Sequence, residues 1–299
     1  YNNRVQIGNA LGSIYGLRYK GVYRYDYDHN GYTTASISSY GYAEVNNTGY
    51  DAQGNPINTA AAAQRRHENF TCPIAYDADG NMLTDAKGIP LPMYYCYNES
   101  YRKQFQGGDA IYEDVNHDGQ IDRYDMVYLG NSNPKCNGGF GFTLFYGRFS
   151  LNTGFNFRMG NKIINLARAN YESMRSNTNQ SYATTWRWRK NGDETVIPRA
   201  LTNVNGYESY NSLPSDRYVE NGNYLRLQYV QLRYEFNPQK LKKYGIRQLT
   251  LSASANNVWC WSKYTGVDPD VSPQGFSVST DNSRTPRTKS FTCSANLSF

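Results

Sequence analysis

The chain has 299 residues, of which 39% are hydrophobic, 15% aromatic and 19% charged, with 29 Tyr and 26 Gly. This aromatic content excludes a disordered chain, and the lack of any run of about 18 apolar residues excludes a helical membrane protein. The net charge of +6 is modest and scattered, so we expect no nucleic-acid partner. The composition favours a β-rich protein, either an extracellular sandwich or an outer-membrane barrel.

Repeated turn chemistry marks the N-terminal part. YDAQGNPI from Tyr50, YDADGNML from Tyr76 and TDAKGIPL from Thr84 each place a Gly three residues after an Asp, between apolar flanks. This pattern predicts hairpin-like turns.

An Asp-rich segment, DVNHDGQIDRYD, runs from Asp114 to Asp125 with Gly119 at its sharp turn. Its oxygen ligands have the spacing of a calcium loop. The candidate ligands are Asp114, Asn116, Asp118, Gln120 through its carbonyl, Asp122 and Asp125. Asp125 replaces the usual Glu, and the alternative is an acidic turn without an ion. Either way, we expect a structural role.

Five segments alternate apolar and polar residues with the period of two that defines a β-strand. We expect these strands at about 140–146, 149–157, 224–236, 246–261 and 289–299. The second strand places Asn152, Gly154 and Asn156 opposite its apolar face, which suits a polar lumen better than a dry core. A phase change in the third, at 224–236, predicts a β-bulge around Tyr229 and Val230.

The connections between these strands are alternately short and long, which is typical of outer-membrane barrels with periplasmic turns and extracellular loops. We expect a tight turn near Gly147, extracellular loops at about 159–221 and 262–286, and a short helix at 163–174 in the first of them. Residues 1–138 form an extracellular region, and 139–299 the barrel strands with their loops.

Two sets of residues in the loops are candidate sites. Trp186, Arg187 and Trp188 could grip a sugar or peptide, although packing that anchors the loop is the simpler interpretation. Cys72 and Cys96 flank two predicted turns in an extracellular region, where oxidation is permitted, so we expect a disulfide between them. The alternative is that all five cysteines are reduced. We find no catalytic motif and expect no enzyme.

Four stretches resemble the C-terminal third of SusC/RagA-type TonB-dependent outer-membrane transporters of Bacteroidetes. They are GNALGSIYGLRYKGVY (Gly8 to Tyr23), the segment from Gly108 to Phe140, SDRYVENGNYLRLQYVQLRYEFN (Ser215 to Asn237) and VWCWSKYTGVDPDVS (Val258 to Ser272). Arg287 to Phe291 and the final NLSF are also similar to the family pattern. The resemblance implies an all-β fold, the C-terminal strands of a transmembrane barrel of about 22 strands.

The resemblance also implies a function. It indicates part of an active importer of a bulky nutrient, an oligosaccharide or a peptide, across the outer membrane. The implied partners are a SusD-like surface lipoprotein, TonB acting through an N-terminal part and plug that this chain lacks, lipid, the barrel-insertion machinery and a second transporter–lipoprotein pair. Phe291, Leu297 and Phe299 resemble the signal read by that machinery. Alternatives are a surface adhesin, a secreted glycan-binding β-protein and an extracellular glycoside hydrolase, the last lacking a recognisable carboxylate pair.

Overall fold

The computed structural model describes residues 8–26, 72–87, 90–98, 101–202, 209–271 and 277–299. The chain divides into two compact units, each built from separate stretches of sequence. The first unit contains residues 15–129 and 168–218, and the second contains 3–14, 130–167 and 219–299. The sequence-based boundary near residue 138 is close to one of these divisions, but most of the expected loop 159–221 belongs to the first unit.

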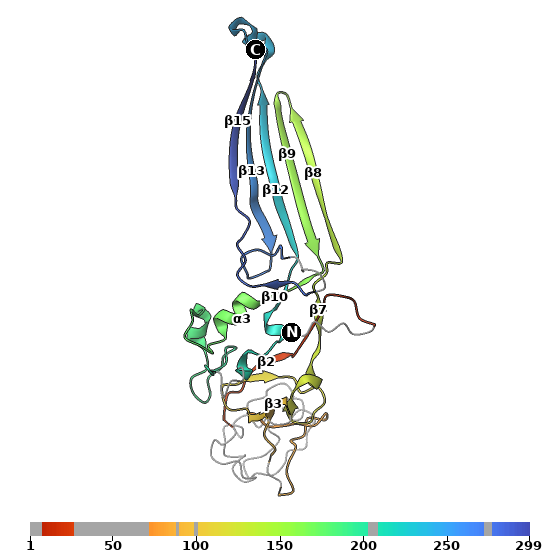
Figure 1. Cartoon of the computed structure of the whole chain (residues 1–299), viewed down its shortest axis with the longest axis vertical. Coiled ribbons are helices and arrows are strands. Elements are labelled where there is room, and N and C mark those ends of the chain that lie inside the picture. Colours follow the sequence, from red (N-terminus) through yellow and green to blue (C-terminus); the bar gives the residue numbers. More distant parts are fainter. Residues whose placement is uncertain (1–7, 27–71, 88–89, 99–100, 203–208, 272–276) are drawn as a thin grey trace. The chain divides into compact units, whose positions relative to one another are not determined.

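A five-stranded antiparallel sheet dominates the second unit, in the order β15-β13-β12-β9-β8 (Figure 1). Its strands are β8 (Cys136–Tyr146), β9 (Phe149–Met159), β12 (Tyr224–Glu235), β13 (Gln248–Ser262) and β15 (Ser290–Ser298). All five lie where the alternating pattern predicts strands. An 11-residue strand such as β9 extends about 36 Å, the length that a tilted strand needs to cross an outer membrane.

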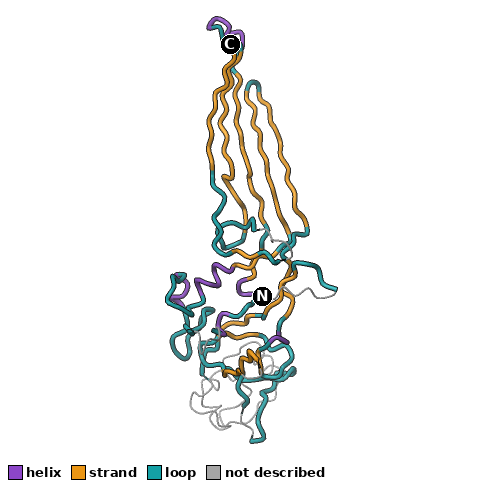
Figure 2. The backbone as a smooth tube through the Cα atoms, viewed as in Figure 1, coloured by secondary structure: helices purple, strands orange, loops and turns teal. Residues whose placement is uncertain are grey.

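The connections of this sheet have the predicted lengths. Gly147, at a φ of 59°, makes the tight turn between β8 and β9. The link from β12 to β13 holds two short helices, α4 (Pro238–Leu241) and η5 (Lys242–Tyr244), shown in purple in Figure 2. Asn237 caps the first helix through Gln239 N–H, and Gly245 ends the second with a φ of 72°.

The predicted bulge in β12 is present, one position earlier than expected. The register of β12 shifts between Leu227 and Tyr229 in both of its pairings. Against β9, Gln228 is the extra residue on β12, whereas against β13 the extra residue is on β13, because Asn257 and Val258 together lie opposite Gln228. The shift keeps the apolar residues on either side of it on the same face of the sheet.

A small three-stranded sheet, ordered β11-β10-β14, completes the second unit. Its strands are β10 (Lys162–Asn165), β11 (Val219–Asn221) and β14 (Thr280–Asp281). The helix expected at 163–174 is therefore shorter: α3 spans Leu166–Glu172, after β10. Ile163 and Ile164 lie in β10 because β-branched side chains favour a strand, and both are buried there.

The first unit has short strands around an aromatic core. Its pairs are β2 (Tyr19–Val22) with β5 (Ala110–Tyr112), and β3 (Tyr94–Asn98) with β4 (Tyr101–Gln104) and β6 (Gln120–Ile121). Four 3-10 helices complete it: η1 (Arg123–Asp125), η2 (Tyr182–Trp186), η3 (Tyr210–Ser212) and η4 (Asp216–Tyr218). The chain passes between the units within β1 (Ser13–Gly16), β7 (Val127–Asn131) and α3, and again between η4 and β11.

The core of the first unit contains Tyr23, Phe105 and Tyr210, with Phe105 and Tyr210 packed edge to face at 5.3 Å. Two predicted turns border it. Asp77 and Gly80 close the first, with Gly80 N–H donating to Asp77 O at 3.0 Å. Thr84 and Pro90 form a bridge across the second. The turn predicted from Tyr50 lies outside the described residues.

Candidate functional site

The five-stranded sheet has one apolar and one polar face, and strand register keeps them separate. Residues directly opposite each other on paired strands point to the same face. One row across all five strands reads Leu144, Leu151, Leu232, Ala253 and Cys293. Every member is apolar or, for the cysteine, a small hydrophobe.

The next row on the opposite face is entirely polar. It reads Thr143, Asn152, Gln231, Ser254 and Thr292. Leu144 is 57% exposed and Leu232 47%, so the apolar face presents large hydrophobic side chains outward. A lipid-facing side and a polar lumen side have this distribution.

Ion pairs hold a loop segment to the polar side of the sheet. Arg226 of β12 pairs with Asp268 at 2.5 Å, and Arg158 of β9 pairs with Asp270 at 3.2 Å. Arg287 also pairs with Asp270. Burial by itself would raise the pKa of Asp268, but hydrogen bonds from Asp270 N–H and the charge of Arg226 hold it below its usual value. These contacts fix the segment 266–271, which belongs to one of the four stretches that carry the family resemblance.

A buried carboxylate joins distant segments of the first unit. Asp109 is fully buried and accepts bonds from Arg199 Nε at 2.6 Å and Nη2 at 3.2 Å. Asn211 donates to the same carboxylate at 3.0 Å, and Gln106 N–H at 2.8 Å. Burial raises the pKa of Asp109 against the lowering effect of Arg199. With each oxygen satisfied and no exposed face, Asp109 is a structural group.

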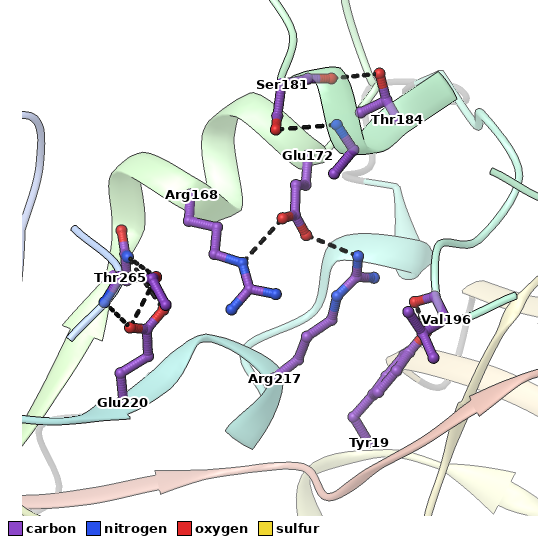
Figure 3. A network of polar contacts seen from close by, with 11 residues as sticks. Tyr19, Arg168, Glu172, Ser181, Thr184, Val196, Arg217, Glu220 and Thr265 are labelled. Atoms are coloured by element: carbon purple, nitrogen blue, oxygen red, sulfur yellow. Dashed lines mark hydrogen bonds and ion pairs between the residues drawn. The ribbon is translucent and has the colours of Figure 1, made fainter. Parts of the chain in front are cut away.

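A second buried ion pair lies beside α3 (Figure 3). Glu172 accepts bonds from Arg168 Nε at 2.9 Å and Arg217 Nη2 at 2.8 Å. The Arg217 guanidinium lies over the rings of Tyr19 and Tyr218, at 5.1 and 5.2 Å from their centroids. Arg217 belongs to the SDRYVENG segment, so this resemblance also marks a packing role.

The Asp-rich segment forms a hydrogen-bonded loop. Gly119, at a φ of +78°, donates its N–H to Asp114 Oδ2 at 2.8 Å, and Asp118 N–H also faces Asp114. Asn116 Nδ2 donates to Asp118 Oδ2 at 3.0 Å. Asp125 is fully buried and accepts the N–H groups of Val115 and Asp122, both at 2.8 Å.

The residue types of the loop suit a cation bound by oxygen ligands, but their side chains are not gathered around one point. Burial, with the nearby charges of Asp114 and Asp122, raises the pKa of Asp125 to about 6, and burial raises the pKa of Asp114. In the part of the chain that the structure describes, no three Asp, Glu, His or Cys side chains gather closely enough to hold a metal ion. Asp122 caps η1 through Tyr124 N–H, and Gln120 lies in β6.

The two tryptophans of the loop have different surroundings. Trp188 Nε1–H donates to Arg24 O at 3.2 Å, and its ring covers Gly108, where a Cβ would overlap it. Trp186 is 69% exposed. Arg187 bonds back to Thr184 O through its N–H at 3.2 Å. Packing therefore accounts for Trp188, and Trp186 remains a candidate contact for a ligand.

The predicted disulfide between Cys72 and Cys96 is wrong for this structure, in which neither cysteine is bonded to another. The Cys72 thiol faces Asp26 O at 3.2 Å, and the Cys96 thiol faces Gln120 Oε1 at 3.0 Å. Cys96 lies in β3, whose pairing with β6 directs its thiol to Gln120. Sequence reasoning missed this because it had no evidence of the parallel pairing.

No helix among the described residues has the length and apolar character that crossing a membrane would require. Phe291, Leu297 and Phe299, the candidate assembly signal, are 74%, 47% and 72% exposed.

Relatives of the chain are receptors. TonB-dependent receptor P39 of Formosa agariphila is 29% identical over 99% of this chain, and TonB-dependent receptor P26 of the same organism is 31% identical over 56%. The chain covers 26% and 17% of the lengths of these relatives. No family model matches the chain.

Solved structures show the same fold. The structure of the RagAB peptide transporter matches this chain with a TM-score of 0.54 and 18% identity. The match covers 69% of this chain and 22% of the transporter chain. The RagAB peptide importer in the closed-closed state matches this chain with a TM-score of 0.54 and 17% identity. That match covers 100% of this chain and 25% of the importer chain. This chain is therefore a relative of part of the TonB-dependent receptors of the outer membrane, and it has the fold of a segment of a RagA-type transporter.

Proposed function

We propose that this chain forms part of the wall and outer loops of a TonB-dependent importer that moves a bulky nutrient across the outer membrane. The observation that carries the proposal is the pair of adjacent rows across the sheet, one wholly apolar through Leu232 and one wholly polar through Gln231. Such a sheet suits a wall between lipid and a water-filled passage. The receptor names of the relatives support the same function.

The nutrient we propose is an oligosaccharide or a peptide. The named RagAB structures are peptide importers, which supports the second class, although the likeness to them is one of fold. Exposed Trp186 could stack on a sugar ring or a peptide side chain. The segment itself would do no covalent chemistry, since its buried carboxylates are engaged in structural bonds.

The partners we propose are a SusD-like surface lipoprotein and TonB, with TonB acting through parts of the receptor outside this chain. The paired name of RagAB supports a two-component assembly. The loop segment held by Asp268 and Asp270 would keep its position on the polar side while the rest of the transporter moves.

A calcium ion in the loop 114–125 is a further part of the proposal. The ligand spacing, the left-handed turn at Gly119 and the raised carboxyl pKa values of Asp114 and Asp125 support it, because a cation would offset the repulsion between these acids. Asp114, Asn116, Asp118, Asp122, Asp125 and the Gln120 carbonyl would hold the ion. Its role would be to order the loop.

The test is uptake by the native bacterium. A strain without the complete receptor gene should lose uptake of one labelled oligosaccharide or peptide class, and the plasmid-borne gene should restore it. Affinity purification of the receptor should recover a surface lipoprotein. Normal uptake of every class tested, together with lost adhesion to a host or glycan surface, would instead support the adhesin alternative.

A further inference from the structure

One end of the five-stranded sheet has a concentration of basic side chains, which we call the basic rim. It lies at the end with the tight turn and the two short helices. Its members are Arg148, Lys240, Lys242, Lys243 and Arg247. All five are exposed.

Backbone contacts bring these residues to the same end of the sheet. Glu235 N–H donates to Arg148 O at 2.9 Å, which joins the β8–β9 turn to the end of β12. Arg247 N–H donates to Ser298 O at 2.8 Å, which joins the start of β13 to the end of β15. Figure 2 shows the two short helices at this end. The rim therefore draws on two connections that are about 90 residues apart in sequence.

The charge of the rim is not neutralised within this part of the chain. None of its five residues forms an ion pair with a carboxylate of the described residues. Across 144–151, 232–251 and 294–299, Glu235 is the one acidic side chain, and it pairs with Arg233 at 2.6 Å. At the opposite end of the sheet, the arginines pair with Asp268 and Asp270. The arginines at that end thus have acidic partners, whereas Arg148 and Arg247 of the rim have none among the described residues.

Exposed aromatic side chains accompany the rim. Tyr146 is 85% exposed and Tyr244 69%. The Lys243 ammonium lies 5.2 Å from the centroid of the Tyr244 ring. Tyrosine favours the boundary between the apolar and headgroup layers of a membrane, and lysine extends its charge beyond that boundary. The rim therefore has the composition of a membrane-surface contact at the edge of the apolar face.

We infer that the basic rim binds the headgroups of anionic phospholipids in the leaflet that meets the short-turn end of the sheet. The inference rests on the proposed barrel wall, because only a membrane-spanning sheet would place this end at a lipid surface. The occupant follows from charge complementarity, because five exposed cations that form no ion pair with a carboxylate of the described residues would face a layer of phosphates. Each lysine near an anionic surface strengthens association about fivefold at low salt.

The experiment uses the full-length receptor, purified in detergent and exchanged into lipid nanodiscs with or without phosphatidylglycerol. Native mass spectrometry would count the phosphatidylglycerol molecules that stay bound after release from the bilayer. The test variant is Lys240→Gln/Lys242→Gln/Lys243→Gln. Its matched control is Lys135→Gln/Lys263→Gln/Lys289→Gln, three exposed lysines at the opposite end of the sheet.

The test variant should bind phosphatidylglycerol more weakly, by on the order of 100-fold at low salt, while the control binds like the wild type. The wild-type receptor should also lose this lipid as salt rises, a readout that does not depend on any variant folding. Equal retention by both triple variants, or salt-independent retention by the wild type, would overturn the inference. Failure of the proposed import function is distinguishable, since nutrient uptake is measured separately and lipid retention needs no substrate.

Discussion

Asp109 and Arg199 lie 90 positions apart in sequence and form a two-point ion pair, with bonds of 2.6 and 3.2 Å. Asp109 is fully buried, and the Arg199 side chain is 25% exposed. The same carboxylate accepts an amide bond from Asn211, so one side chain holds three segments of the first unit together. These bonds give Asp109, in the segment that begins at Gly108, a structural role.

Arg199→Leu should destabilise the first unit by about 3 kcal/mol, because it leaves the Asp109 carboxylate buried without its cation. Hydrogen exchange of the full-length receptor, followed at peptides covering 106–112, would measure the change. Arg18→Gln is the matched control: Arg18 pairs with Glu113 at 2.9 Å on the surface, and its loss should cost less than about 1 kcal/mol. Similar exchange in the two variants would contradict a structural role for Asp109.

The loop segment around Asp268 should loosen in acid. The pKa of the Asp268 carboxyl is below 3.8 in the folded state. The stabilisation that Asp268 contributes is therefore fully present above the pKa of the unfolded state, and it is lost as the pH falls through the pKa of the folded state. Hydrogen exchange of residues 263–271, measured as the pH falls below 3.8, would report the loosening. Asp268→Asn should remove this part of the pH dependence and raise exchange at neutral pH. An unchanged pH profile in Asp268→Asn would show that another group controls the loop.

Asp118→Ala should loosen residues 114–125 if calcium orders them, while the sheet remains folded. In the full-length receptor, added calcium should slow proteolysis within this loop for the wild type and have no effect on the variant. Asp79→Ala, at an exposed position of the same unit, provides the control. Proteolysis that does not respond to calcium or to a chelator in the wild type would leave the loop as a metal-free acidic turn.

Trp188→Ala should destabilise its loop by about 2 kcal/mol, because the ring covers Gly108 and bonds to Arg24 O. Trp186→Ala should leave stability unchanged, since Trp186 is 69% exposed. If Trp186 contacts the nutrient, its loss should weaken binding severalfold. Thermal unfolding and calorimetric binding to the full-length receptor separate the two effects. Wild-type affinity in Trp186→Ala would remove this residue from the candidate site.

Phe299→Ser should lower the amount of receptor in the outer membrane, because the apolar alternation of β15 ends at this aromatic residue, which is 72% exposed. Ser298→Ala changes the polar face of the same strand and should have little effect. Surface labelling and immunoblotting of outer membranes would compare the two variants. Equal levels would contradict a role for Phe299 in assembly.

Local sequence patterns are sufficient to predict the strands of the sheet. Alternation with a period of two is a local property, so β8, β9, β12, β13 and β15 could be predicted within a few residues, and so could the bulge near Tyr229. The family resemblance likewise came from short motifs. The helical spacing of 163–174 also covers Ile163 and Ile164, which lie in β10, because a short apolar run fits the period of a helix or of a strand.

Which distant residues meet depends on tertiary packing. The register placed Leu144, Leu232 and Cys293 in one row, although they come from strands far apart in sequence. The pairing of β3 with β6 directed Cys96 to Gln120 and away from a disulfide. The bond between Asp109 and Arg199 has no local signature either. Such contacts depend on how separate segments pack, because burial and hydrogen bonding of a side chain are set by neighbours in space and not by neighbours in sequence.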